Sequence, residues 1–101
     1  MMMETFDLRK IEPGEGMAEV FAGSENYSAR VIKLEAGGEI PPCDMEAHLL
    51  FVVLEGKAKI NAGEEAAVMQ EGMCLVSEPE IMSMRSEEGA RLLGIQVEVE
   101  D

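Results

Sequence analysis

The sequence predicts an all-β fold in a single domain, and three observations support this. The chain has 101 residues, a length at which one hydrophobic core is enough for folding. Turn-forming residues recur from the middle of the chain onward and leave segments too short for ordinary helices. Within these segments apolar residues follow a period of two, and none carries the i, i+3, i+4, i+7 pattern of an amphipathic helix. We therefore expect residues 1–101 to form one domain.

The predicted turns divide the chain into short strands. They lie at Gly37-Gly38, Pro41-Pro42, Glu55-Gly56, Gly63, Gly72, Glu78-Pro79 and Glu88-Gly89. Before them, residues 17–22 and 29–34 are expected as strands because they are rich in Val, Ile and Phe, despite charges at Glu19, Arg30 and Lys33.

Residues 47–54 differ from the other predicted strands because both of their faces are apolar. One face carries His48, Leu50, Val52 and Leu54, and the other carries Leu49, Phe51 and Val53. A barrel interior covers one face, and the outer face then needs a second sheet or another subunit. We expect a homodimer formed through this outer face.

Three further strands follow the same alternation. In residues 57–61, Ala58 and Ile60 are expected to face inward, while Lys57, Lys59 and Asn61 face water. Residues 73–76 are expected to bury Cys74 as a small hydrophobic side chain. Residues 91–99 form a half-buried strand, in which Leu93, Ile95, Val97 and Val99 share one face while Gln96 and Glu98 take the other.

Composition excludes several classes of partner and location. Acidic residues outnumber basic ones 21 to 8, and the net charge of −13 argues against nucleic acid as a partner. The longest apolar run, residues 49–54, is far short of the ~20 residues that cross a membrane. The first ten residues lack the apolar core of a secretory signal, so we expect a cytoplasmic location. Cys43 and Cys74 are too sparse for a disulfide framework and are expected as thiols.

Several segments together resemble the cupin superfamily. They are Gly38-Glu39-Ile40-Pro41-Pro42, then Phe51-Val52-Val53-Leu54-Glu55-Gly56-Lys57-Ala58, Gly63-Glu64, Gly72 and Glu88-Gly89-Ala90-Arg91-Leu92-Leu93. The likeness extends over roughly residues 28–99, and its most specific piece is the V-L-E-G turn after a strand that is apolar on both faces. The resemblance implies a cupin-type double-stranded β-helix, also called a jelly-roll barrel.

The resemblance also implies where a divalent metal would be held, and the usual ligands are missing. Cupins place two histidines and a glutamate before the V-L-E-G turn, and these positions hold Cys43, Met45 and Leu49 here. The third histidine position falls on Met82, or alternatively on Ser83 or Met84. Leucine has no donor atom, and thioether sulfur is a poor ligand for nickel, manganese, iron(II) or zinc. We therefore expect no metal, no cofactor and no catalytic residue.

The residues at these inner positions predict an apolar cavity instead. The candidate ligand-binding residues are Cys43, Met45, Leu49, Phe51, Met82 and Met84. An alternative is that these side chains simply fill the barrel, and another is a soft copper(I) site built from the cysteine and methionine sulfurs. His48, the single histidine, is expected to point away from the interior and to serve a structural or interface role. The acidic pairs Glu64-Glu65, Glu78/Glu80 and Glu87-Glu88 are expected to be solvated.

These expectations favour a non-catalytic, dimeric module that binds a small apolar ligand inside its barrel. Two alternatives stay open. One is a metal-dependent enzyme with non-standard ligands, which would include His48 and nearby carboxylates or a soft-metal site at Cys43. The other is a purely structural dimerisation domain.

Overall fold

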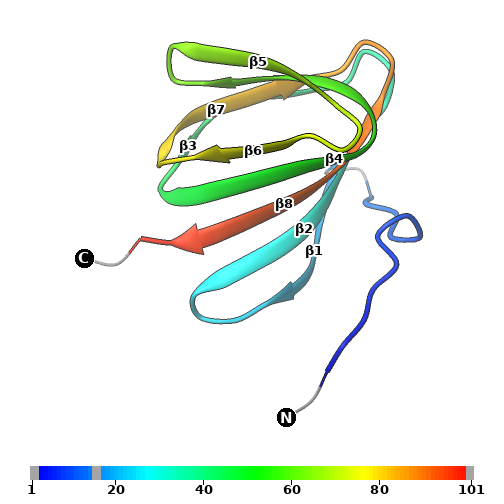
Figure 1. The fold of residues 1–101 in the computed structure, drawn as a ribbon, viewed down its shortest axis with the longest axis vertical. Coiled ribbons are helices and arrows are strands. Elements are labelled where there is room, and N and C mark those ends of the chain that lie inside the picture. Colours follow the sequence, from blue (N-terminus) through cyan, green and yellow to red (C-terminus); the bar gives the residue numbers. More distant parts are fainter. Residues whose placement is uncertain (1–2, 15–16, 100–101) are drawn as a thin grey trace.

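Eight antiparallel strands form a curled sheet that folds over into two facing layers (Figure 1). The computed structural model describes residues 3–14 and 17–99, and no helix occurs in them. The strands are β1 (Ala18–Gly23), β2 (Tyr27–Leu34), β3 (Glu39–Met45), β4 (Ala47–Ala62), β5 (Glu65–Gln70), β6 (Cys74–Ser77), β7 (Glu80–Arg85) and β8 (Ala90–Glu98). The predicted all-β class is confirmed. Within these described ranges, nothing has the helical length and apolarity needed to cross a bilayer.

The topology is organised around β4. Neighbouring strands follow the order β1-β2-β8-β4-β7-β3, while β5 and β6 each pair with β4 outside this path. The first half of β4 pairs with β8 and β6, and its second half pairs with β5 and β7. One long strand therefore belongs to both layers, and it bends from one into the other in Figure 1.

The bend in β4 occurs at Gly56, where the sequence predicted a turn between two strands. That prediction was wrong, because residues 47–62 are one continuous strand. Gly56 has φ +79°, and a Cβ added there would lie 2.2 Å from the carbonyl oxygen of Gly89. The ladder to β8 also shifts register between Val53 and Glu55. Glycine lets β4 turn toward the other layer without leaving the sheet.

The Pro41-Pro42 pair, also predicted as a turn, lies inside β3. Proline has no N–H to donate, so it is tolerated at a sheet edge or in a bulge. β3 meets both conditions, since it pairs only with β7 and its register shifts between Ile40 and Cys43.

The interior of the barrel contains the side chains of β4 at odd positions up to Val53 and at even positions after the bend. Leu49, Phe51 and Val53 are buried as predicted, and so are Ala58 and Ile60. Other strands complete the core with Ile32, Leu34, Met69, Met82, Met84, Ala90 and Leu92. The bend explains the change of parity, because the register shift beside Gly56 moves the inward face by one residue.

The apolar face predicted for the last strand is real, but it lies outside the barrel. Leu92 is fully buried, whereas Leu93 and Ile95 are half-buried and Val97 is exposed. The ladder explains this, since Val53 lies opposite Leu92 on the inner face. Each face of β8 carries a leucine, Leu92 on one and Leu93 on the other, so alternation alone does not say which face enters the core.

Cys74 was expected to be buried and is exposed instead. It pairs with Val52 across the β4–β6 ladder. Val52 lies on the outer face of β4, and directly opposed residues of an antiparallel pair project to the same side of a sheet. The side chain of Cys74 therefore faces outward.

The N-terminal segment lies beside the end of the barrel where β8 begins, as the dark blue trace in Figure 1 shows. Arg91 anchors it by donating hydrogen bonds to the carbonyl oxygens of Leu8 (3.1 Å) and Ile11 (2.5 Å) and to Glu12 Oε1 (2.9 Å). Lys33 donates to the other oxygen of Glu12 at 2.9 Å. These contacts place the segment over Arg91 and Lys33, on the outer face of β8 and β2.

Candidate functional site

A cavity of about 330 Å³ lies inside the barrel between the edge strands β1 and β3. All six residues proposed from the sequence line it: Cys43, Met45, Leu49, Phe51, Met82 and Met84. The remaining lining residues are Met17, Ala18, Arg30, Ile32, Ile40, Pro41, Ser83, Ile95 and Gln96. Apart from Arg30, Ser83 and Gln96, the residues that line the cavity are therefore apolar or sulfur-containing.

The strand ladders explain why these residues meet. Leu49 lies opposite Gln96 and Phe51 lies opposite Gly94, so both side chains of β4 project inward beside β8. A Cβ on Gly94 would lie 3.0 Å from the Phe51 ring and 3.3 Å from Ile32 Cδ1. The missing side chain at Gly94 thus gives Phe51 and Ile32 room to pack over the backbone of β8.

The opening of the cavity lies between strands that do not pair with each other. β1 and β3 are the two ends of the ladder path, and residues from both line the cavity. On β3, Pro41 removes a backbone donor that would otherwise pair with an approaching strand. Beside β1, Met17 has φ +64°, a left-handed conformation that costs a non-glycine residue about 1–2 kcal/mol. The missing donor at Pro41 disfavours pairing of β3 with another strand at this edge.

Arg30 is the one charged residue on the cavity wall within residues 3–14 and 17–99. It lies on the inner face of β2, where it pairs with Gly94 of β8. Its Nη2 donates hydrogen bonds to Ser28 Oγ at 3.1 Å and to Gln96 Oε1. Arg30 and Gln96 together form a polar spot in otherwise apolar surroundings.

Sequence reasoning missed Arg30 and Gln96 as site residues. Arg30 has the same parity as Ile32 in its strand, and Gln96 has the same parity as Leu92 in its own. The available signal for Arg30 was that a charged residue shares a strand face with the core residue Ile32. It was not decisive, because Lys33 carries a second charge on the opposite face of the same strand.

The lining residues do not fit the divalent metal that the resemblance implies. The three positions before the bend hold Cys43, Met45 and Leu49, and the later position faces Cys43 from β7 as Met82. Among residues 3–14 and 17–99, no three His, Cys, Asp or Glu side chains gather closely enough to hold an ion. A borderline or hard cation needs nitrogen or oxygen donors. A soft cation would find sulfurs here, but it would also meet the positive charge of Arg30.

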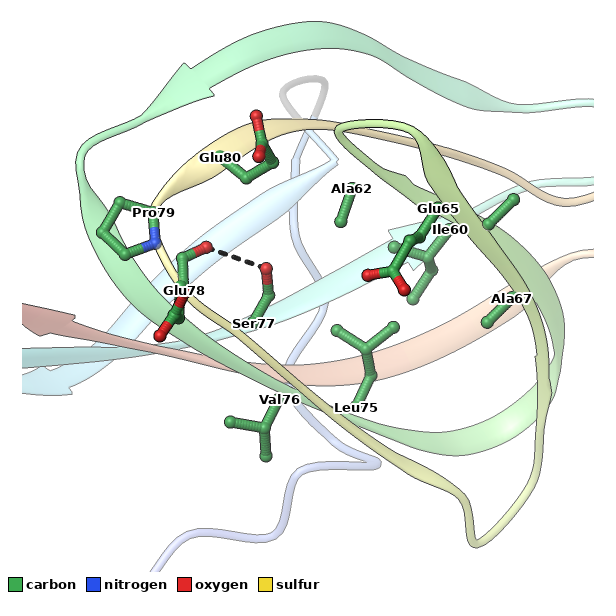
Figure 2. Close-up of a pocket in the computed structure, with 11 residues that line it drawn as sticks. Ile60, Ala62, Glu65, Ala67, Leu75, Val76, Ser77, Glu78, Pro79 and Glu80 are labelled. Atoms are coloured by element: carbon green, nitrogen blue, oxygen red, sulfur yellow. Dashed lines mark hydrogen bonds between the residues drawn. The ribbon is translucent and has the colours of Figure 1, made fainter.

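A second hollow, of about 460 Å³, opens between β5 and the β6–β7 connection (Figure 2). It contains three glutamates, Glu65, Glu78 and Glu80, whose side chains point in different directions in Figure 2. Glu80 accepts a hydrogen bond from the backbone N–H of Ile81 at 3.0 Å, and Ser77 donates to the carbonyl oxygen of Glu78 at 2.8 Å. The carboxylates do not converge, as paired acid–base chemistry would require.

His48 lies on the outer face of β4 and is exposed, as the alternation predicted. Its cross-strand partner is Val97. The imidazole is therefore outside the cavity, and the structure does not bring His48 together with the six proposed site residues.

The fold is similar to that of several solved structures. An RmlC-like cupin protein from Desulfovibrio desulfuricans matches with a TM-score of 0.81 and 22% identity, over 95% of this chain and 97% of that one. A cupin superfamily protein from Desulfitobacterium hafniense matches with a TM-score of 0.80 and 16% identity, over 91% and 87%. A conserved protein of unknown function from Streptococcus pyogenes matches with a TM-score of 0.79 and 19% identity, over 100% and 92%.

Comparison by sequence gives no further guide. No protein-family model matches the chain, and no curated protein matches it. The structural likenesses all lie below 25% identity and therefore concern the fold alone. That fold is the cupin-type double-stranded β-helix predicted from the sequence.

Proposed function

We propose that this cupin-type barrel is a non-catalytic, dimeric module that binds a small, largely apolar molecule in its interior cavity. The cavity between β1 and β3 carries the proposal. Its volume of about 330 Å³ lies at the small end of the roughly 300–1,000 Å³ found for ligand pockets. Its lining is predominantly apolar with a few polar groups, the usual composition of a small-molecule site.

The binding part of the proposal is tested with 1-octanol as a neutral apolar probe. Octanol should raise the unfolding temperature in a saturable way, since a ligand that binds the folded state stabilises it by mass action. Replacing Cys43 at the cavity rim by Trp should weaken this effect by placing an indole in the opening. The matched control is Val68→Trp, which adds the same ring on the outer side of β5. No stabilisation of the wild type by octanol or by longer alcohols would contradict the proposal.

The dimer part of the proposal concerns the outer face of β6, β4, β8 and β2. Two adjacent cross-strand rows there hold Cys74, Val52, Leu93, Val31 and Val76, Leu50, Ile95, Ala29. Val31 and Ala29 are already buried in the single chain, so the part open to a second copy lies on β6, β4 and β8. Neither row contains a charged residue from β6 to β2, although the chain has 21 acidic residues, and the first charge in either row is Glu19 on β1. A second copy is the partner that fits, because two chains of charge −13 approach each other most easily through an uncharged apolar face.

Val76→Glu tests the dimer because Val76 is 75% exposed in the single chain. A glutamate there costs the monomer little, whereas it would bury a carboxylate in a dimer. The matched control, Val68→Glu, alters a 55% exposed valine on β5, outside these rows. Sedimentation equilibrium at micromolar concentration should find dimers for the wild type and Val68→Glu and monomers for Val76→Glu. A monomeric wild type would refute the dimer.

A further inference from the structure

The cavity wall carries a positive charge that has no counter-ion among the described residues. Arg30 is half-buried, and both of its hydrogen bonds leave from Nη2. Its Nε is buried and has no hydrogen-bond partner in residues 3–14 and 17–99. Nη1 also makes no hydrogen bond to the described residues and, unlike Nε, is not buried, so this end of the guanidinium can bind an acceptor that the described chain does not supply.

The missing partner is notable in a chain with 21 acidic residues. The ion pairs found within the described ranges use Lys10, Lys33 and Arg91, and no carboxylate lies within 4.0 Å of Arg30. Among the residues that the structure describes, no aspartate or glutamate lines the cavity. Placing an uncompensated charge beside apolar side chains is unfavourable, and a bound anion would relieve it.

We propose that the cavity binds a monocarboxylate with an apolar body, and that Arg30 binds the carboxylate. This inference rests on the proposed ligand-binding function and specifies its ligand class. A guanidinium N–H such as that of Nη1 donates a charge-assisted hydrogen bond to a carboxylate oxygen. Gln96 orients the group by accepting from Nη2, and Leu49, Phe51 and Met82 provide apolar contact for the body of the ligand. The volume equals that of about ten liquid water molecules, which suits a ligand of about that many non-hydrogen atoms.

The charge of the protein favours a monoanion over a phosphate dianion. A chain of net charge −13 repels anions at long range. This repulsion grows with the charge of the ligand, whereas the cavity offers one guanidinium to oppose it. Selectivity for an anion must therefore come from a local contact, and Arg30 is the cation that lines this site.

Three probes of equal chain length test the assignment: sodium octanoate, 1-octanol and octylamine. We expect octanoate to bind the wild type at least tenfold more tightly than octanol by isothermal titration calorimetry at neutral pH. We expect octylamine to bind more weakly than octanol, even though the long-range field of the protein attracts cations. The two outcomes together identify a local positive group in the site.

Arg30→Gln removes the charge and keeps a side chain of similar polarity. Octanoate should lose its tenfold advantage in this variant, while the affinity for octanol should change by less than threefold. The control Arg85→Gln removes an exposed arginine that does not line the cavity, and it should bind all three probes as the wild type does. Persistence of the octanoate preference in folded Arg30→Gln would overturn the assignment.

The outcomes separate this inference from the proposed function. If octanol binds the wild type as tightly as octanoate does, the inference fails and the apolar site stands. If none of the three probes binds, both the inference and the proposed ligand-binding function fail. If Arg30→Gln does not fold, the wild type still decides, because octylamine binding as tightly as octanoate would refute a role for Arg30.

Discussion

Among the glycines with positive φ, Gly56 is the one whose replacement by alanine should destabilise the barrel most. Gly56 lies where β4 passes between the two layers, with φ +79°. An added Cβ would lie 2.2 Å from the Gly89 carbonyl oxygen and 3.0 Å from Ala90 Cα. Both contacts are with backbone atoms beside the β4–β8 ladder, so a side-chain rotation cannot relieve them.

Two contributions set the size of the effect. The left-handed conformation costs alanine about 1–2 kcal/mol. The added methyl would also force the backbone of Gly89 away from β4. This resembles overpacking of a core and costs a further 1–3 kcal/mol, roughly. The sum of about 2–5 kcal/mol is a large part of the roughly 5–15 kcal/mol that stabilises a domain.

Gly72→Ala provides the matched control. Gly72 has φ +89°, but no atom lies within 4 Å of the position that its Cβ would take. Its substitution should therefore show the conformational cost alone, about 1–2 kcal/mol. Urea unfolding followed by far-UV circular dichroism gives both free energies. Equal losses for the two variants would show that the close approach between Gly56 and Gly89 does not matter.

Three other substitutions address the N-terminal anchor and the core. Hydrogen bonds from Lys33 and Arg91 lower the pKa of Glu12 below its ordinary value of 4.5, so its stabilising contribution is complete above that pH and is lost as the pH falls through the lowered value. The wild type should therefore lose more of its urea midpoint between about pH 6 and pH 3 than Glu12→Gln does. An equal loss in the two proteins would contradict this. Arg91→Met should cost about 2–3 kcal/mol through the lost charged hydrogen bonds and speed tryptic cleavage in the N-terminal segment; unchanged proteolysis would argue against the anchor. Leu92→Ala, at a fully buried position, should cost about 2–5 kcal/mol in urea unfolding, and a loss below 1 kcal/mol, roughly, would place Leu92 outside the core.

Much of the barrel could be predicted because alternation and glycine carry direct physical meaning. The alternation in residues 47–54 correctly separated Leu49 and Phe51 from His48. Gly56 was correctly identified as a point of direction change, although the change is a bend within β4 and not a turn. Local sequence does not distinguish these two cases, because both require a residue that tolerates positive φ.

Other features depended on contacts between distant strands. Alternation defines two faces of β8, but the pairing with β4 decides that Leu92 enters the core and Leu93 does not. The exposure of Cys74 follows in the same way from its position opposite Val52. Arg30 entered the candidate site for a similar reason, because pairing with β8 turns it toward the cavity. Residue type would instead have placed a charged side chain in solvent.

The alternation in β4 also makes the proposed dimer and the proposed binding site separable. Before the bend, odd positions such as Leu49 and Phe51 line the cavity, whereas even positions such as Leu50 and Val52 belong to the outer face. A polar substitution at Val76, opposite Leu50 on the outer face, should therefore dissociate a dimer without changing the affinity for octanoate. If Val76→Glu altered both properties, association and binding would be coupled, and the cavity would have to change shape when the second copy docks.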